Sequence, residues 1–248
     1  MRVLELFAGS RSIGKAAEAL GMEVLSTDIT AYTDMHLVGD VLHLPMKRWV
    51  EFQPDIIWAS PPCTGFSVAS IGAHWTGGRG AYIPKSSTAC IGMALALRTI
   101  EIIRACKPTV WFVENPRGML RIMKFMEQLG APRTVTYCQY GDSRQKPTDI
   151  WTNCTTWMHK PACSPGAACH DAAPRGSRTG TQGRNGAHER SKIPHALCME
   201  VMTAAQHAID TKAITRLFPY IDKPSRDPFA EIILAKQAQR TPELFATA

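Results

Sequence analysis

The segment Asp55-Ile56-Ile57-Trp58-Ala59-Ser60-Pro61-Pro62-Cys63 joins an apolar run to an abrupt stop. Residues 56–59 predict a buried strand, and the two prolines end it because neither can donate a hydrogen bond to a sheet. The cysteine that follows then lies at the carboxyl end of a strand, where α/β sheets bind their ligands. Cys63 is therefore a candidate nucleophile, although a cysteine that stands alone is more often a small buried hydrophobic residue.

Strands and helices alternate on both sides of this segment. Strands are expected at residues 3–7, 23–27, 37–38, 56–59, 109–113 and 134–138, and helices at 12–20, 88–106, 117–129 and 196–208. This order predicts an α/β fold with a mostly parallel, Rossmann-like sheet and helices on both faces. Ligands of such a sheet bind at the carboxyl ends of the strands.

Composition is that of a folded protein with a polyanionic partner. The chain has 248 residues, of which 45% are hydrophobic and 20% charged, enough for one good-sized core and a small appendage. We expect neither a membrane span nor a signal peptide, and hence a cytoplasmic location with reduced or metal-bound cysteines. The net charge of +7 favours a polyanion as partner. A monomer that does not bind membranes is expected.

Three further motifs flank Cys63. They are residues 4–14 (LELFAGSRSIG), Glu114-Asn115-Pro116-Arg117 after the strand at 109–113, and residues 139–146 (QYGDSRQK). In this order and spacing they resemble the DNA (cytosine-5) methyltransferase family, with its Phe-x-Gly cofactor loop, Pro-Pro-Cys nucleophile loop, Glu-Asn loop and basic motif. The resemblance covers about the first three-fifths of the chain and, more loosely, a stretch near residue 195.

The resemblance implies a compact enzyme of the kind encoded by phages and prophages, acting in a bacterial host. It would use S-adenosylmethionine to methylate C5 of cytosine in double-stranded DNA. A restriction-modification context is one setting for such an enzyme. An RNA cytosine-5 methyltransferase and a catalytically inactive DNA-binding remnant remain the two alternatives.

Four residues receive catalytic roles. Cys63 would attack C6 of a flipped cytosine, which makes C5 nucleophilic. Glu114, at the end of a buried strand, would be protonated and meet ring N3. Arg144 is the first choice of cation for the C2 carbonyl, and Lys146 is a shared candidate. The register of the basic motif stays open, because either Asp142 or Arg144 can stand where the family has Gln.

Cofactor contacts are implied at several strand ends and in the nucleophile loop. They are Phe7, Ala8, Gly9, Ser10, Asp28, Ile29, Asp40, Val41 and Pro61. Asp28 would hold the ribose hydroxyls and Asp40 the adenine amino group, with a helix cap or a solvated turn as the alternative for each acid. Arg11 departs from the small residues of the family loop and lies either along the cofactor or toward DNA.

The composition changes after Trp151, which suggests a division of the chain. We expect a catalytic core at 1–151, a miniature target-recognition insert at 152–192, a helix at 193–210 returning to the core, and a tail at 211–248 packing on it. The insert is too short for a core of its own, so a structural zinc held by Cys154, Cys163, Cys169 and His170 is one prediction. Ordinary reduced cysteines are the alternative.

DNA contacts are expected from the glycine-rich loop after Cys63, which is typical of a lid, and from the Gly/Arg-rich part of the insert. The candidates are Ser67, Trp75, Arg79, Arg175, Arg178 and Arg184. Trp75 or a neighbour would fill the gap that the flipped base leaves. The competing interpretations are a disordered loop and a solvated linker.

Overall fold

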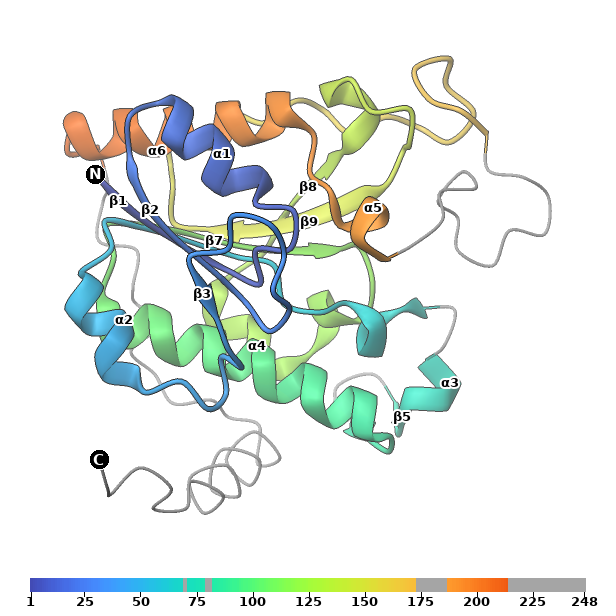
Figure 1. Ribbon diagram of the computed structural model, residues 1–248. Helices are drawn as coiled ribbons and strands as arrows, with labels where there is room; N and C mark the ends of the chain where they lie inside the picture. Colours follow the sequence, from blue (N-terminus) through green and yellow to red (C-terminus); the bar gives the residue numbers. More distant parts are fainter. Residues whose placement is uncertain (69–70, 79–81, 173–186, 214–248) are drawn as a thin grey trace, which may run out of the picture.

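A seven-stranded sheet forms the centre of the protein in the computed structural model, which describes residues 1–68, 71–78, 82–172 and 187–213 (Figure 1). The strands lie in the order β3-β2-β1-β4-β7-β9-β8. Their bounds are β1 (Arg2–Leu6), β2 (Glu23–Asp28), β3 (Leu37–Val38), β4 (Ile56–Ala59), β7 (Val110–Pro116), β8 (Arg133–Thr136) and β9 (Pro147–Thr152). The first five strands of this order run parallel to one another, which confirms the predicted mostly parallel α/β sheet.

Strands β4 and β7 show why the sheet forms where it does. All four residues of β4 are buried, and so are the first six of the seven residues of β7. Continuous apolar runs of this kind are typical of parallel strands that are covered on both faces. Glu114 and Asn115 lie inside β7, which extends beyond its predicted end at residue 113.

Helices cover both faces of the sheet (Figure 1). Helices α1 (Ser12–Ala19) and α6 (His195–Asp210) lie on one face, and α2 (Met46–Phe52) and α4 (Ser87–Cys106) lie on the other. Helix α4 begins after Ser86, whose hydroxyl accepts a hydrogen bond from the backbone N–H of Ala89 at 3.1 Å. The apolar side chains of each face form a core cluster of their own.

Strand β9 is antiparallel and lies between β7 and β8. Its register sets Ile150 beside Glu114, Asp149 beside Asn115 and Thr148 beside Pro116. No strand was expected at residues 147–152 from the sequence. The last pair of this register is Pro116 with Thr148, so the loop that precedes Pro147 lies just beyond the end of β7.

The helix predicted at residues 117–129 is wrong. This segment forms two 3-10 helices, η3 (Met119–Ile122) and η4 (Lys124–Leu129), which are separated by Met123 in an extended conformation. The chain at Gly118 passes so close to the preceding loop that an added Cβ would lie 2.5 Å from the carbonyl oxygen of Phe66. Tertiary packing therefore decides the path here. Similarly, the strand predicted at 134–138 ends at Thr136 and continues as η5 (Tyr137–Tyr140).

The remaining described elements are short. They are η1 (Thr64–Phe66), α3 (Ile71–His74), the hairpin of β5 (Trp75–Thr76) and β6 (Ile83–Pro84), and α5 (Ala187–Ser191). None of the helices in the described ranges has the length and apolar character needed to cross a membrane. Beyond residue 213, the predicted C-terminal tail lies outside the described residues.

A buried carboxylate fixes the start of α1 on the sheet. Glu5 is 2% exposed and accepts hydrogen bonds from the backbone N–H of Ile13 at 3.1 Å and from the hydroxyl of Ser26 at 2.7 Å. Gly14 leaves room for this pair, because a Cβ there would lie 2.7 Å from both side-chain oxygens. Burial raises the pKa of Glu5 from 4.5 to about 6, although Ser26 and the backbone donors act in the opposite direction.

We expect Glu5 to give the protein a pH-dependent stability. Its folded-state pKa lies above its unfolded value, so the native state binds more protons between pH 4.5 and about 6. The free energy of unfolding therefore falls as pH rises through this window, by about 2 kcal/mol. Denaturant unfolding below and above the window should show a smaller loss for Glu5→Gln than for the wild type. The same pH dependence in both proteins would contradict this role.

Candidate active site

The loops that follow β1, β4 and β7 meet at one edge of the sheet. Ala59 at the end of β4 pairs with Val113, so the loop that begins at Ser60 runs beside the buried Glu114 and Asn115. Cys63 lies on this loop and is exposed. The structure thus brings the predicted nucleophile to the strand end that carries the predicted acid.

Hydrogen bonds hold the nucleophile loop in place. The side-chain amide of Asn115 donates to the carbonyl oxygen of Pro61 at 2.8 Å. The backbone N–H of Phe66 donates to the carbonyl of Cys63 at 2.9 Å, and the indole N–H of Trp75 donates to the carbonyl of Gly65 at 2.6 Å. The loop is therefore fixed from both sides of Cys63, as a nucleophile needs if it is to be preorganised.

Two glycines allow the nucleophile loop to pack closely on its neighbours. A Cβ at Gly65 would come within 3.0 Å of the carbonyl oxygen of Thr88 at the start of α4. On the other side, Gly118 presses against Phe66, whose ring stacks on Trp75 with centroids 5.7 Å apart. Larger residues at these glycines would displace Cys63.

Three titratable side chains influence one another at this edge. Desolvation and the Glu114 carboxylate raise the pKa of the Cys63 thiol above its ordinary value, while Lys146 and Arg190 act in the opposite direction. Burial lowers the pKa of Lys146, against the effect of Glu114 and Cys63. Glu114 accepts a hydrogen bond from the hydroxyl of Tyr137 at 3.1 Å, and the Lys146 ammonium lies 4.5 Å from the centre of the Tyr137 ring.

The two candidate cations, Arg144 and Lys146, have different surroundings in the structure. Arg144 is fully buried, forms an ion pair with Asp142, and donates to the backbone carbonyls of Arg190 at 3.0 Å and Lys192 at 3.1 Å. A guanidinium so occupied has no surface left for a substrate, which corrects the first choice of Arg144 as the catalytic cation. Lys146 is the candidate whose charge acts on both Cys63 and Glu114.

The predicted cofactor loop bends sharply after β1. Phe7 has φ 58° and Gly9 has φ 49°, both in the left-handed region that costs energy for residues other than glycine. The backbone N–H of Ala8 donates to the carbonyl of Thr27, and that of Gly9 donates to the carboxylate of Asp28 at 2.9 Å. The ends of β1 and β2 are thereby joined, with the side chain of Ser10 bonded to that of Ser12 at 2.7 Å.

The other predicted cofactor residues lie along the same edge. Asp28 also accepts from the N–H of Thr30, and Asp40 accepts from the N–H of Leu42 and contacts His43, all at 2.9 Å. Both acids thus form the local turns that were the alternative to ligand binding. Ile29 is 69% exposed, whereas Val41 and Pro61 are buried.

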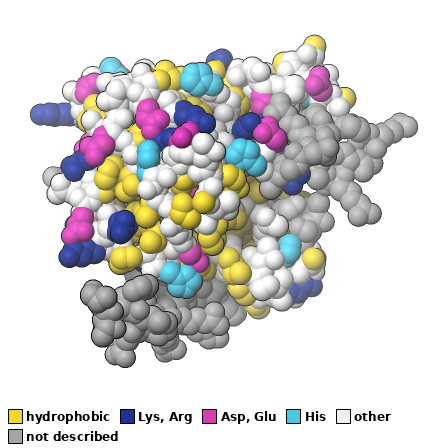
Figure 2. Space-filling view, viewed as in Figure 1, with side chains coloured by type: hydrophobic (Ala, Val, Ile, Leu, Met, Phe, Trp, Pro, Cys, Tyr) yellow, Lys and Arg dark blue, Asp and Glu magenta, His cyan; other side chains and the backbone are white. Residues whose placement is uncertain are grey.

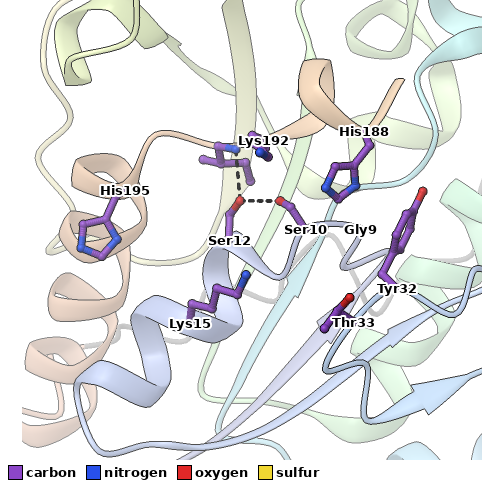
Figure 3. Close-up of a pocket in the computed structure, with 10 residues that line it drawn as sticks. Gly9, Ser10, Ser12, Lys15, Tyr32, Thr33, His188, Lys192 and His195 are labelled. Carbon is purple, nitrogen blue, oxygen red and sulfur yellow. Dashed lines mark hydrogen bonds between the residues drawn. The ribbon is translucent and has the colours of Figure 1, made fainter. Parts of the chain in front are cut away.

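A pocket of about 470 Å³ opens beside this loop (Figure 3). It is lined by Gly9, Ser10, Ser12, Lys15, Tyr32, Thr33, His188, Lys192, Ile193 and His195. The backbone N–H of Ile193 donates to the hydroxyl of Ser12 at 3.3 Å and closes one side. Sequence reasoning missed most of these residues, and the signal for them was the loose match of Ile193-Pro194 to the family's last motif.

Arg11 neither lines this pocket nor extends to solvent. It is 4% exposed, donates to the hydroxyl of Ser26 at 3.1 Å, and forms an ion pair with Glu18. The guanidinium of Arg11 also contacts the ring of His36 at 3.3 Å, which links the start of α1 to the segment after β2. The departure from the family pattern is therefore a structural contact in this chain.

The model of the C-5 cytosine-specific DNA methylase family matches residues 1–124, which are half of the chain and include Gly9, Cys63 and Glu114. The chain belongs to this family. Members of the family are S-adenosylmethionine-dependent DNA cytosine-5 methyltransferases, and this is the enzyme class of the chain. The chain is also 29% identical over 219 residues to a protein of frog virus 3 (isolate Goorha) named "Probable DNA (cytosine-5)-methyltransferase", covering 82% of this chain and 99% of the viral protein.

Solved methyltransferase structures resemble a smaller part of the chain. Dnmt2 methyltransferase of S. pombe has a TM-score of 0.43 and 14% identity, covering 61% of this chain and 48% of that one. EhMeth of Entamoeba histolytica has a TM-score of 0.47 and 12% identity, covering 61% and 52%. The chain spans about half the length of these two solved chains.

The residues predicted to contact DNA differ in their exposure, and some of them lie outside the described residues. Ser67 is exposed beside Val68, which is 62% exposed. Trp75 is only 4% exposed, and its bond to Gly65 and its stacking on Phe66 occupy it, so it cannot fill a gap in DNA. Arg79, Arg175, Arg178 and Arg184 lie outside the described residues. On the face in Figure 2, the coloured basic and acidic side chains are interspersed.

The predicted metal set needs one correction. Cys154 is completely buried in the core cluster that contains Trp157 and α6, and its sulfur contacts the hydroxyl of Thr156. Cys138, which the sequence analysis did not include, takes its place beside Cys163, Cys169 and His170. Spacing along the chain could not reveal this, because Cys138 precedes β9 and the other three follow it.

We predict that Trp75→Phe lowers stability without weakening DNA binding. Phenylalanine keeps the stacking on Phe66 but loses the hydrogen bond to Gly65, which should cost about 1 kcal/mol. The measurements are denaturant unfolding and DNA binding by the variant. Ile91→Ala, at an exposed position on α4, is the control and should change stability by less than about 0.5 kcal/mol. Unchanged stability with weaker DNA binding by Trp75→Phe would restore Trp75 to the DNA interface.

Proposed function

We propose that this methyltransferase transfers a methyl group from S-adenosylmethionine to C5 of a flipped cytosine in double-stranded DNA, with Cys63 as a covalent nucleophile. Family membership supplies the reaction class. The observation that carries the mechanism is the arrangement at one sheet edge, where Asn115 beside Glu114 holds the loop of Cys63 and Tyr137 contacts both Glu114 and Lys146. A thiol, a carboxyl group and an ammonium group are the functional groups that this reaction needs.

The pocket beside Gly9 suits the amino-acid part of the cofactor. When bound, S-adenosylmethionine supplies an electrophilic methyl group on its sulfonium. Lys15 and the hydroxyls of Ser10 and Ser12 line the pocket and would bind the carboxylate of the cofactor. The positive φ of Gly9 lets the backbone turn beside this pocket, which supports the same position.

The acidic residues at the next strand ends suit the nucleoside part. Asp28 keeps acceptor capacity for ribose hydroxyls, because each carboxylate oxygen accepts more than one hydrogen bond. Asp40 would accept from the adenine amino group. The exposed side chain of Ile29 would cover the adenine ring and would be buried by it.

The chemistry follows from the groups around Cys63. Its thiolate adds to C6, so that a sulfur–carbon bond forms and electron density moves to C5 and N3. Glu114 would donate a proton to N3, and the Lys146 ammonium would face the C2 carbonyl. C5 would then accept the methyl group as its bond to the cofactor sulfur breaks, and S-adenosylhomocysteine would be left. A base removes the C5 proton, and the electrons of that bond expel Cys63 from C6.

The burial of Glu114 is the reason to expect base flipping. Cys63 is exposed but Glu114 is only 5% exposed, so a base that meets both must enter the sheet edge. A base stacked in a duplex cannot do this, and extrusion costs a few kcal/mol. Ser67 and Val68 follow Cys63 on the exposed side of the loop and would contact the strand around the extruded nucleotide.

The proposed nucleophile is tested by trapping. Duplex DNA with 5-fluorocytosine at the target should form a denaturation-resistant adduct with the wild type, because fluorine cannot leave as the C5 proton does. Cys63→Ala should form no adduct and should lose methyl transfer to background, while binding the cofactor nearly as the wild type does. Labelled-methyl transfer, adduct gels and calorimetry give the three measurements.

Cys90→Ala is the matched control, because Cys90 is also exposed but lies on α4. It should retain both the adduct and the activity. Methyl transfer by Cys63→Ala near the wild-type rate would exclude the covalent role of Cys63. Transfer to RNA in preference to duplex DNA would contradict the proposed substrate.

The electrostatic coupling predicts opposite pKa shifts of Cys63 in two variants. Glu114 raises the pKa of the thiol, so Glu114→Gln should move its alkylation profile to lower pH. Lys146 lowers that pKa, so Lys146→Met should move the profile to higher pH. Iodoacetamide labelling of the Cys63 peptide, followed by mass spectrometry across pH, measures both.

The Cys90 peptide in the same samples is the internal control, and its profile should be identical in all three proteins. Shifts of Cys63 in the same direction in both variants would indicate a general loosening of the loop. That result would contradict the proposed arrangement of charges.

A further inference from the structure

Four ligand atoms from two segments of the chain converge beside η5. The Sγ atoms of Cys138, Cys163 and Cys169 and the Nδ1 atom of His170 all lie within 4.8 Å of one another. The separations are 3.1 Å for Cys138–Cys163 and 3.6 Å for Cys138–Cys169, and His170 lies 3.6 Å from both Cys163 and Cys169. The adjacent Cys169 and His170 therefore reach the same point.

These separations fit a tetrahedral zinc site. With zinc–sulfur bonds of about 2.3 Å, the corners of a tetrahedron lie about 3.8 Å apart. A disulfide would instead need sulfurs about 2.05 Å apart, and all eight cysteines are free thiols. Three thiolates and one imidazole form a ligand set that favours Zn²⁺ over harder cations.

The surroundings of the sulfurs are those of metal-bound thiolates. The side-chain amide of Gln139 donates to the sulfur of Cys169 at 3.3 Å, and that of Gln145 donates to the sulfur of Cys163 at 3.4 Å. Hydrogen bonds of this kind orient ligands and stabilise their charge.

The segment that supplies three of the ligands has no core of its own. None of residues 158–172 is buried, although the segment takes a defined path along η5. Ordering a backbone costs roughly 1–2 kcal/mol per residue, which small units commonly offset with a metal. The hydrogen bonds from Lys160 to Tyr140, from Cys163 to Thr136 and from Asp171 to Ser143 hold the segment at three points, but they bury none of its residues.

We propose that Cys138, Cys163, Cys169 and His170 bind one structural zinc ion that fastens residues 158–172 to η5. The neighbouring residues give the site a consequence for catalysis. Tyr137, beside Cys138, donates to Glu114, and the loop of Ser143 and Gln145 leads to Lys146. The zinc ion would thus hold the insert and stiffen the loop of the catalytic cation at the same time.

The test is the metal content of protein purified without an affinity tag from zinc-supplemented medium. The wild type should carry about one zinc per chain by elemental analysis. Cys138→Ser and Cys169→Ser should fall to background, and Cys169 is exposed, so its loss cannot act through the core. Cys154→Ser and Cys90→Ser should retain the metal, which separates this ligand set from the set predicted by sequence.

A second measurement identifies the ligands directly. Cobalt exchanged into the site should give thiolate-to-cobalt charge-transfer absorption and the intense d–d bands of a tetrahedral ion, both absent in Cys138→Ser. Chelation should increase hydrogen exchange within residues 158–172 while S-adenosylmethionine still binds.

Three results would overturn the site: no zinc in the wild type, zinc lost from Cys154→Ser but kept by Cys138→Ser, or a disulfide between Cys138 and Cys163. None of these readouts uses methyl transfer. The zinc site and the proposed reaction can therefore fail independently.

Discussion

The buried guanidinium of Arg144 joins parts of the chain that lie almost fifty residues apart, and the active site depends on it. Burying such a charge is costly unless every donor finds a partner, and Asp142 and the carbonyls of Arg190 and Lys192 supply the partners. Lys146 donates to the same carbonyl of Arg190. The segment held in this way continues into Ile193, which closes the pocket beside Gly9, and into α6. One buried charge therefore positions both Lys146, which is the proposed catalytic cation, and a wall of the proposed cofactor pocket.

Strand β9 explains why the roles of the basic residues could not be assigned from the sequence. It begins with a proline and contains polar residues that the antiparallel pairing buries, so it lacks the apolar pattern of the central strands. The register with β7 ends where Thr148 pairs with Pro116, so the residue just before Pro147 lies in the loop beyond this pairing, where its charge and that of Glu114 act on each other. Lys146 occupies that position, with φ 27°, while Arg144 two residues earlier is turned into the interior. Only the pairing of strands that lie far apart in the sequence distinguishes Lys146 from Arg144, and no local sequence pattern reveals this pairing.

Much of the sheet and the positions of the functional loops could be predicted, because local signals mark them. An apolar run that ends in two prolines located β4 and Cys63, and the loop around Gly9 had its own motif. Whether a side chain faces solvent or the interior could not be predicted in the same way. Trp75 and Cys154 were recognised as residue types with chemistry, yet both are buried, one against the nucleophile loop and the other beneath α6. Whether an aromatic ring or a thiol faces solvent depends on packing between segments, which composition does not contain.

Residues 158–172 and the groups around Cys63 are ordered by contacts with the same short region of this methyltransferase. Residues 158–172 bury no side chain, so their order must come from polar contacts and ligands. Three hydrogen bonds supply these contacts: Lys160 bonds to Tyr140, Cys163 to Thr136, and Asp171 to Ser143. The same short region carries Tyr137, which holds Glu114, and Lys146. Anything that orders the insert therefore also restrains the acid and the cation around Cys63. The contacts that fix residues 158–172 and those around Glu114 and Lys146 are therefore made by one short region, residues 136–146.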